Sequence, residues 1–406
     1  MQYSTIPFTL VDHDQAFILD VDALYEHAAA LTDGRKPRGC RYSLALLLTV
    51  AVLAKLAGFV RMEDLADWAK LRRHELQQFF GTTRTTMPHH TTWSRVLGKA
   101  VDVEELEELV QRLLAAPPVG EVPDRCSIHV AVDGKTLRGT IPRGSTRGVH
   151  LLAAYCPDAG VVLFQVAVDT KENEIVAAPT LLKRLDLTGT LATGDAMFTQ
   201  RQLSIQIVES GGDYLWMVKD NQPTLRADIE LLFAPEYVSA GWSAPPVDFT
   251  TARSITKGHG RIEERILTTS SMLAGYSDWP YLAQVFQLEY RTWCCVTGKV
   301  TVDLRYGVTS APVTVLDAQG LLQATRRHWG METGLHGRRD ISFREDAMRT
   351  RNGQAPHVMA TLNNLALSLL GRLGITNVAE AQRALNYHID RALYGLPLRT
   401  PAQGTN

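Results

Sequence analysis

Residues 127–168, SIHVAVDGKTLRGTIPRGSTRGVHLLAAYCPDAGVVLFQVAV, decide the fold of this chain. Apolar and β-branched residues gather at 127–132, 150–156 and 161–168, a pattern that predicts three strands. A glycine-rich loop separates the first segment from the second, and the turn PDAG separates the second from the third. Strands that follow one another in this way can form an antiparallel meander.

Farther along the chain, helix and strand alternate. The sequence predicts a helix at 174–185, a strand at 191–194, a helix at 199–209 and a strand at 213–218. A meander followed by strands that return through helices makes a mixed sheet with helices against its faces. The predicted fold class is therefore α/β, and this order of elements is the one found in ribonuclease H-like folds.

A helical region precedes the sheet. Apolar residues recur at three- and four-residue spacing through 17–115, which predicts helices. The apolar run at 43–59 is too short to cross a bilayer, so we expect it to be a buried helix. Prolines and a glycine at 117–123 predict a linker, and we therefore predict an all-α domain at 1–118.

A β-rich insertion and a second helical region complete the chain. Four strand-like segments, FTTARSIT, RIEERILTTS, YLAQVFQLEY and TWCCVTG, lie within 220–315, and helical periodicity resumes near Ala318. A broad apolar stripe follows in HVMATLNNLALSLLGRL. These features predict an α/β domain at 124–400 that contains the insertion at 220–315.

Composition limits the classes of function. The length of 406 residues suggests two or three domains, and 42 Lys plus Arg against 43 Asp plus Glu give no overall basic charge. Evidence for nucleic-acid binding must therefore be local. The five cysteines match neither a metal-binding CxxC pair nor a secreted disulfide framework. Since the sequence shows neither a signal peptide nor a membrane span, we expect a cytoplasmic protein without membrane contact.

Two aspartates lie at the ends of predicted strands. Asp133 follows HVAV and precedes Gly134, whereas Asp195 follows LATG. In isolation the first is more often a turn residue and the second a helix N-cap. The predicted strand order, however, puts their strands side by side, and two converging carboxylates repel each other unless a cation neutralises them. Oxygen clusters of this kind bind Mg²⁺.

A third acid is needed to hold two metal ions, which together stabilise the attacking and leaving oxygens of a displacement at phosphorus. The best candidate is Glu332, in the arginine-rich segment RRHWGMETGLHGRRDISFREDAMRTR. Helical spacing predicts that His328, Glu332 and Arg339 lie on one side of a helix. The alternative is a solvated helix whose charges form salt bridges with one another.

Several motifs resemble those of one family. HVAVDGKTLRGT, DTKENEIVAAPTLLKRLDLTGTLATGDAMFTQ, GGDYLWMVKDNQPTL, KGHGRIEER and HWGMETGLHGRRDISFREDAMRTRNG are similar, in this order, to the ISAs1 family of insertion-sequence transposases, which includes the H-repeat-associated proteins. RYSLALLLTVAVLAKLAG and PHHTTWSRVL resemble the small domain that precedes the catalytic domain in that family. The resemblance covers nearly the whole chain.

The resemblance implies a DDE transposase with a ribonuclease H-like core, which cleaves DNA at the ends of an insertion sequence and transfers the strands into target DNA. It also implies dependence on Mg²⁺, for which Mn²⁺ can substitute. In the family motif, His328 and Arg339 take the places of an arginine and a lysine, and Glu345 and Asp346 are alternatives for the third acid. By motif, the catalytic and metal-binding acids are Asp133, Asp195 and Glu332.

Polar and basic residues near these motifs predict contacts to double-stranded DNA, both the terminal inverted repeats and the target. Arg95 lies in PHHTTWSRVLGKAV, which predicts either a recognition helix or a packing helix with Trp93 and Leu97 in the core. Each candidate is as readily an ordinary exposed residue, but as a set they predict salt-sensitive binding. The other predicted DNA-binding residues are Lys135, Arg138, Lys219, Asn221, Gln222, Lys257, His259, Arg261, His328 and Arg339.

The resemblance further implies a homodimer on DNA, associated with the bacterial nucleoid. Two other functions stay open at this point: a nuclease that uses the same acids without joining strands, and a domesticated copy that only binds DNA. The sequence contains no GxSxG, HExxH or P-loop pattern that would support an unrelated hydrolase.

Overall fold

The computed structural model describes residues 19–38, 40–114, 124–169, 173–234 and 247–394. The chain divides into two compact units. Unit 1 comprises residues 1–119, 134–177 and 332–406, and unit 2 comprises residues 120–133 and 178–331. The predicted linker at 117–123 lies outside the described residues.

The strands of the described residues form a sheet in the order β3-β2-β1-β4-β5-β9-β8-β7-β6. The predicted strands of the core are confirmed, because β2 pairs antiparallel with β3, while β1 pairs parallel with β4, and β4 with β5. The order of these five strands is that of a ribonuclease H-like fold. The bounds are β1 Ile128–Thr136, β2 His150–Cys156, β3 Val161–Val168, β4 Thr190–Gly194, β5 Asp213–Val218, β6 Thr250–Gly258, β7 Arg261–Ser270, β8 Gln284–Cys294 and β9 Val300–Thr309.

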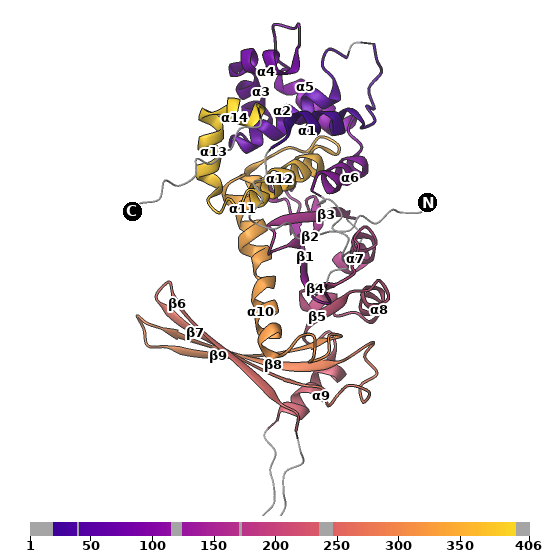
Figure 1. Ribbon diagram of the computed structural model, residues 1–406, viewed down its shortest axis with the longest axis vertical. Helices are drawn as coiled ribbons and strands as arrows, with labels where there is room; N and C mark the ends of the chain where they lie inside the picture. The colour runs from indigo at the N-terminus through magenta and orange to yellow at the C-terminus, as the bar shows by residue number, and fades with distance from the viewer. Residues whose placement is uncertain (1–18, 39, 115–123, 170–172, 235–246, 395–406) are drawn as a thin grey trace, which may run out of the picture. The chain divides into compact units, whose positions relative to one another are not determined.

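The β-rich insertion continues the core sheet. β9 pairs antiparallel with β5, and β8, β7 and β6 follow as an antiparallel meander (Figure 1). The prediction that TWCCVTG forms a strand holds only for residues 292–294, because β8 ends at Cys294 and the chain turns through Gly298, whose φ is 67°, before β9 begins. The sequence analysis also missed β9 and the helix α9 (Pro223–Phe233) that precedes the insertion strands.

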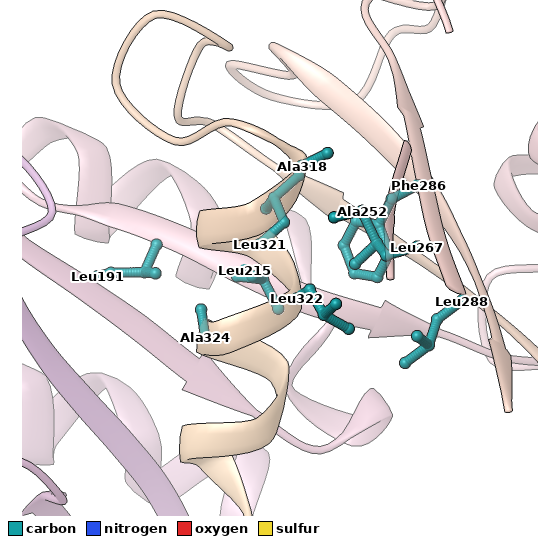
Figure 2. Packing of buried hydrophobic residues seen from close by; sticks show 10 residues of the cluster. All are labelled: Leu191, Leu215, Ala252, Leu267, Phe286, Leu288, Ala318, Leu321, Leu322 and Ala324. Carbon is teal, nitrogen blue, oxygen red and sulfur yellow. The ribbon is translucent and has the colours of Figure 1, made fainter. Parts of the chain in front are cut away.

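Helix α10 (Ala318–His328) organises the core of unit 2. Its apolar side chains pack against residues from the core strands and from the insertion strands alike (Figure 2). Burial of each large side chain contributes about 1.5–3 kcal/mol, so one helix holds both parts of the sheet. The cluster consists of Leu191, Leu215, Ala252, Leu267, Phe286, Leu288, Ala318, Leu321, Leu322 and Ala324.

Helix α12 (Ala355–Arg372) lies at the centre of unit 1, where it packs against α2, α5, α6 and β3. All residues of α2 (Leu44–Leu56) are buried, so the predicted buried helix is confirmed. Within the described parts of the chain, no helix combines the length and the apolar composition that a membrane crossing requires. The other helices of this unit are α1 Val21–Ala29, α3 Met62–Leu71, α4 Arg73–Phe80, α5 His90–Lys99, α6 Val103–Leu114, α13 Val378–Tyr387 and α14 Ile389–Leu393.

The chain between α10 and α12 is not one regular helix. A π-helical turn spans Met331–His336, and α11 (Gly337–Ile341) follows it. Because a π-helical turn holds more residues than an α-helical turn, positions seven apart no longer share a side. Glu332 is exposed and Arg339 is buried. The prediction that these two residues lie on one side of a helix was therefore wrong.

Candidate active site

Two of the predicted acids lie beside each other in unit 2: Asp133 within β1, and Asp195 directly after β4. The parallel register of β1 and β4 runs from Ile128↔Thr190 to Val132↔Gly194, and Asp133 and Asp195 directly follow this last pair. Neighbouring strands are about 4.8 Å apart. Asp133 is half-buried and Asp195 is exposed. The two carboxylates therefore start from neighbouring positions at one edge of the sheet.

Both aspartates belong to the face of the sheet that α10 covers. Residues two apart in a strand point to the same face. Leu191 packs against α10, so Asp195, four residues farther on, follows the alternation of that face. On β1, His129 bonds to Thr193 of β4 on the same face, and Asp133 is again four residues farther on.

The loop after Asp195 is held by residues that follow β5. The side-chain amide of Asn221 donates to the carbonyl oxygen of Ala196 at 2.7 Å. The amide of Gln222 donates to the carbonyl oxygen of Thr199 at 2.8 Å. These bonds give both side chains a supporting role for the loop that carries Asp195, and their contact with DNA stays a prediction.

Glu332 belongs to unit 1, as do the residues directly after Asp133. Within this unit the Lys135 ammonium donates to both carboxylate oxygens of Asp340, at 2.7 and 2.6 Å. The same ammonium lies 3.8 Å from Asp346, and 10% of the Lys135 side chain is exposed. The ion pair joins the segment after Asp133 to the segment after Glu332. It also compensates the charge of Lys135, which was predicted to contact a DNA phosphate.

Arg339 and Glu345 form a buried ion pair, with 2.7 Å between Nε and Oε2 and no exposed surface on either side chain. The Asn363 amide donates to the other carboxylate oxygen at 2.9 Å. This bond offsets part of the cost of desolvating the pair, although Arg339 Nη2 is buried without a hydrogen-bond partner among the described residues. The sequence predicted that Arg339 contacts a DNA phosphate and that Glu345 is an alternative for the third metal-binding acid. Their complete burial argues against both roles.

Gly134 allows two side chains to approach the backbone beside Asp133. A Cβ atom at this position would lie 2.4 Å from the Glu174 carboxylate and 2.7 Å from His150 Nε2. His150 Nε2 lies 2.8 Å from Glu174 Oε1, and its Nδ1 lies 2.8 Å from the Thr136 hydroxyl. The glycine after the first aspartate is therefore needed to admit this hydrogen-bonded group.

Hydrogen bonds that could not be read from the sequence connect His129 of β1, Thr193 of β4 and His328 of α10. His129 Nε2 is 2.7 Å from the Thr193 hydroxyl, which is 3.1 Å from His328 Nδ1. Burial lowers the pKa of His129 to about 3, so this imidazole is neutral. The alternation of β1 could have revealed it, because His129 and Asp133 share a face.

The remaining predicted DNA-binding residues are mostly exposed. Lys257, His259 and Arg261 come together at the turn between β6 and β7, where His259 has a φ of 48°. Lys219 and Arg95 are exposed, and the Arg138 side chain is 80% exposed at 3.5 Å from Asp346. Arg261 pairs with Glu263 at 2.6 Å.

Helix α5, which carries Arg95, begins at His90 and shows features of both interpretations of its motif. Trp93 and Leu97 are fully buried, as expected of a packing helix. Arg95 and Lys99 are exposed on the same helix, as expected of a helix that faces DNA. One side of α5 therefore packs in unit 1 while the other offers basic side chains.

The donors available for a metal ion fit a hard divalent cation. Asp133 and Asp195 supply carboxylate oxygens directly after the last residue pair of β1 and β4, and such oxygens are the ligands that Mg²⁺ or Mn²⁺ prefers. Among the residues that the structure describes, no group of three His, Cys, Asp or Glu side chains is arranged to hold a metal ion. Asp133 and Asp195 lie in unit 2, and Glu332 lies in unit 1.

Comparison with known proteins shows a likeness over most of the chain. Residues 124–369 match the family described as Transposase DDE domain, and residues 25–114 match the family described as DDE_Tnp_1-associated. The putative transposase YncI of Escherichia coli O157:H7 is 29% identical over 360 residues, which cover 87% of this chain and 88% of that protein. The H repeat-associated putative transposase YhhI of Escherichia coli K12 is 28% identical over 365 residues, 87% of this chain and 91% of that protein.

An uncharacterized protein in the dhlA 3′ region of Xanthobacter autotrophicus is 32% identical over 273 residues, which cover 66% of this chain and 88% of that protein. A solved structure of piggyBac transposase in a synaptic complex with hairpin DNA aligns with a TM-score of 0.46 at 11% identity, covering 95% of this chain and 84% of that chain. The match to the Transposase DDE domain spans more than half of the sequence. The chain therefore belongs to the family of DDE transposases of the insertion-sequence type, enzymes that cleave DNA and transfer its strands.

Proposed function

We propose that the catalytic and metal-binding acids of this transposase are Asp133, Asp195 and Glu332. The observation that carries the proposal is the parallel pairing of β1 with β4, which ends next to the first two acids. The ion pair between Lys135 and Asp340 supports the inclusion of Glu332, because it joins the segments that follow the first and third acids. The exposed position of Glu332 in a π-helical turn is also typical of a functional residue.

DDE transposases use divalent metal ions, and we propose Mg²⁺ as the physiological ion here, with Mn²⁺ as a substitute. Two carboxylates on neighbouring strands repel each other, so a cation between them lowers the free energy of the folded site. Ions held by the three acids would supply charge neutralisation at the scissile phosphate and activation of the attacking oxygen. The chain itself positions the acids through β1, β4 and the loop bonded to Asn221 and Gln222.

Double-stranded DNA is the proposed partner, as the terminal inverted repeats of the element and as the target. Phosphate contacts fit the exposed basic side chains, which lie on α5, after β5 and at the β6–β7 turn. Because each phosphate contact releases counterions, affinity for end DNA should fall steeply as salt rises. The residues in this proposed interface are Arg95, Arg138, Lys219, Lys257, His259, Arg261 and His328.

The resemblance of the motifs also supports several finer proposals. We propose that the enzyme belongs to the ISAs1 subgroup, that it acts as a homodimer on paired ends, and that it works in the cytoplasm at the nucleoid. The helical region at 1–118 is the proposed end-recognition domain and 124–400 the proposed catalytic domain, with its insertion at 220–315. A strand-transfer assay with pre-cut ends separates this function from that of a nuclease, because a nuclease would not join these ends to target DNA.

The experiment that tests the assignment of the acids replaces Asp195 with asparagine. Asp195→Asn removes a charged ligand but keeps the shape of the side chain, so it should abolish cleavage of end DNA while a gel-shift assay shows nearly normal binding. Asp278→Asn is the matched control, because the Asp278 side chain is 91% exposed and pairs with Arg201 at the surface. It should cleave like the unaltered enzyme.

The outcome of this experiment is clear in both directions. Cleavage by Asp195→Asn at the normal rate would remove Asp195 from the site. A loss of cleavage in both variants would point instead to a general loss of folding, which circular dichroism would detect.

A further inference from the structure

Beneath the proposed catalytic acids, a threonine hydroxyl connects two imidazole rings within unit 2. His129 is in β1, four residues before Asp133, and Thr193 is in β4, two residues before Asp195. Thr193 Oγ1 lies 2.7 Å from His129 Nε2 and 3.1 Å from His328 Nδ1. Thr193 is 1% exposed and His129 is 2% exposed, so the bond between them is shielded from water, whereas His328 is half-buried.

A hydroxyl has one proton, so it can donate to only one of the two rings and must accept from the other. In one arrangement His129 Nε2–H donates to Thr193, and the Thr193 hydroxyl donates to His328 Nδ1. In the reverse arrangement His328 donates to Thr193, Thr193 donates to His129 Nε2, and the proton of neutral His129 must reside on Nδ1.

The environment of His129 Nδ1 decides between the two arrangements. This nitrogen is buried and has no hydrogen-bond partner among the described residues. The reverse arrangement would bury an N–H group without an acceptor, which is rare in folded proteins, whereas an acceptor without a donor is tolerated more often. The first arrangement therefore has the lower free energy, and it leaves His328 with an unprotonated Nδ1 and a proton on Nε2.

We propose that His129 and Thr193 are positioning residues that hold His328 in the tautomer protonated on Nε2, so that this N–H donates to a phosphate oxygen of the DNA bound at the acids. The inference rests on the proposed function, since it needs a phosphate at Asp133 and Asp195. His328 is the last residue of α10, and its bond to Thr193 holds the ring on the face that both aspartates share. A neutral N–H donor adds no further positive charge to a site that already binds cations.

The test uses the full-length chain with its histidines labelled with ¹⁵N, and the His328 ring signals are identified by their absence in His328→Gln. Nitrogen chemical shifts distinguish a protonated ring nitrogen from an unprotonated one. We expect unprotonated Nδ1 and protonated Nε2 in the unaltered protein. In Thr193→Val, which keeps the shape and removes the hydroxyl, both tautomers should exchange and the two shifts should move toward each other.

The same variants are compared in single-turnover cleavage of end DNA. Thr193→Val should cleave about 10- to 100-fold more slowly, because a hydrogen bond to a charged oxygen loses its fixed donor. Thr193→Ser keeps a hydroxyl and should restore both the ring shifts and the rate. Thr190→Val is the matched control, since it removes another buried hydroxyl of β4, one bonded to the Leu187 carbonyl oxygen, and should change neither.

Each outcome decides one part of the inference. A protonated His328 Nδ1 in the unaltered protein would contradict the proposed tautomer. His328 ring shifts that Thr193→Val leaves unchanged would contradict the positioning role of Thr193. Changed ring shifts with an unchanged cleavage rate would overturn the phosphate contact. Failure of the proposed function would appear in a different experiment, as normal cleavage by Asp195→Asn. The ring shifts would still test the hydrogen bonds among His129, Thr193 and His328.

Discussion

Replacement of Arg339 by methionine should destabilise unit 1 strongly without removing a DNA contact. The Arg339 side chain has no exposed surface, and its Nε donates to Glu345 at 2.7 Å. Methionine keeps much of the aliphatic volume but leaves the Glu345 carboxylate buried, with the Asn363 amide still bonded to it. Loss of one partner from a buried ion pair costs about 3–5 kcal/mol, because the remaining charge is uncompensated.

Urea denaturation measures this cost as the difference in free energy of unfolding between the variant and the unaltered protein. Arg61→Met is the matched control in the same unit, because Arg61 is 62% exposed and its pair with Asp64 lies in solvent. We expect no measurable change for this control, since water screens the pair. The double variant Arg339→Met, Glu345→Leu should recover much of the loss, because the carboxylate that lost its partner is removed as well.

Two results would refute the reasoning. The first is an Arg339→Met variant that unfolds within about 1 kcal/mol of the unaltered protein, the range typical of exposed pairs. The second is a fall of about one in the slope of log affinity for DNA against log salt, which is the sign of a lost phosphate contact. Either result would support contact between Arg339 and DNA, which the burial of its side chain argues against.

Gly134→Ala should lower the melting temperature by several degrees, because the new Cβ would lie 2.4 Å from the Glu174 carboxylate. Gly258→Ala is the control and should keep the normal melting temperature, because a Cβ there meets no atom within 4 Å. Equal melting temperatures of the two variants would contradict this prediction. Burial lowers the pKa of Lys55 from 10.5 to about 7, so between these pH values the unfolded chain binds a proton that the folded chain does not. Stability relative to Lys55→Met should therefore rise with pH through that window in urea titrations, and parallel curves would rule this out. Asn221→Ala removes the bond to Ala196 and should slow cleavage with little loss of DNA binding; a large loss in a gel-shift assay would instead assign Asn221 to the DNA interface.

The five core strands could be predicted within a few residues because each is a short apolar segment bounded by turn residues. The position of Asp195 at the end of β4 followed from the same pattern, whereas β1 continues past Asp133 to Thr136. β9 was missed because Asp303 and Arg305 interrupt its apolar residues, and its pairing with β5 and β8 stabilises it regardless. Strand formation there depends on neighbours that are distant in sequence.

The Glu332 segment shows where local pattern fails. A regular helix would place Arg339 on the side of Glu332, but the π-helical turn at Met331–His336 changes the phase, and Arg339 turns inward to Glu345. Residue types do not predict a π-helical turn, because such a turn forms where the packing of the flanking segments favours it. The hydrogen bonds of Lys135 and Asn221 could not be predicted for a related reason, since their partners Asp340 and Ala196 lie outside their own motifs.

Local periodicity and turn residues in the chain were thus sufficient to identify the strands of the core, the buried helix α2 and the position of Asp195 after β4, because these properties depend on residues within one segment. Packing between distant segments decided that the insertion extends the core sheet, that Arg339 is buried, and that Thr193 connects His129 with His328. Those outcomes are set by burial and hydrogen bonding among residues far apart in sequence, and the free energies involved arise only when the segments meet.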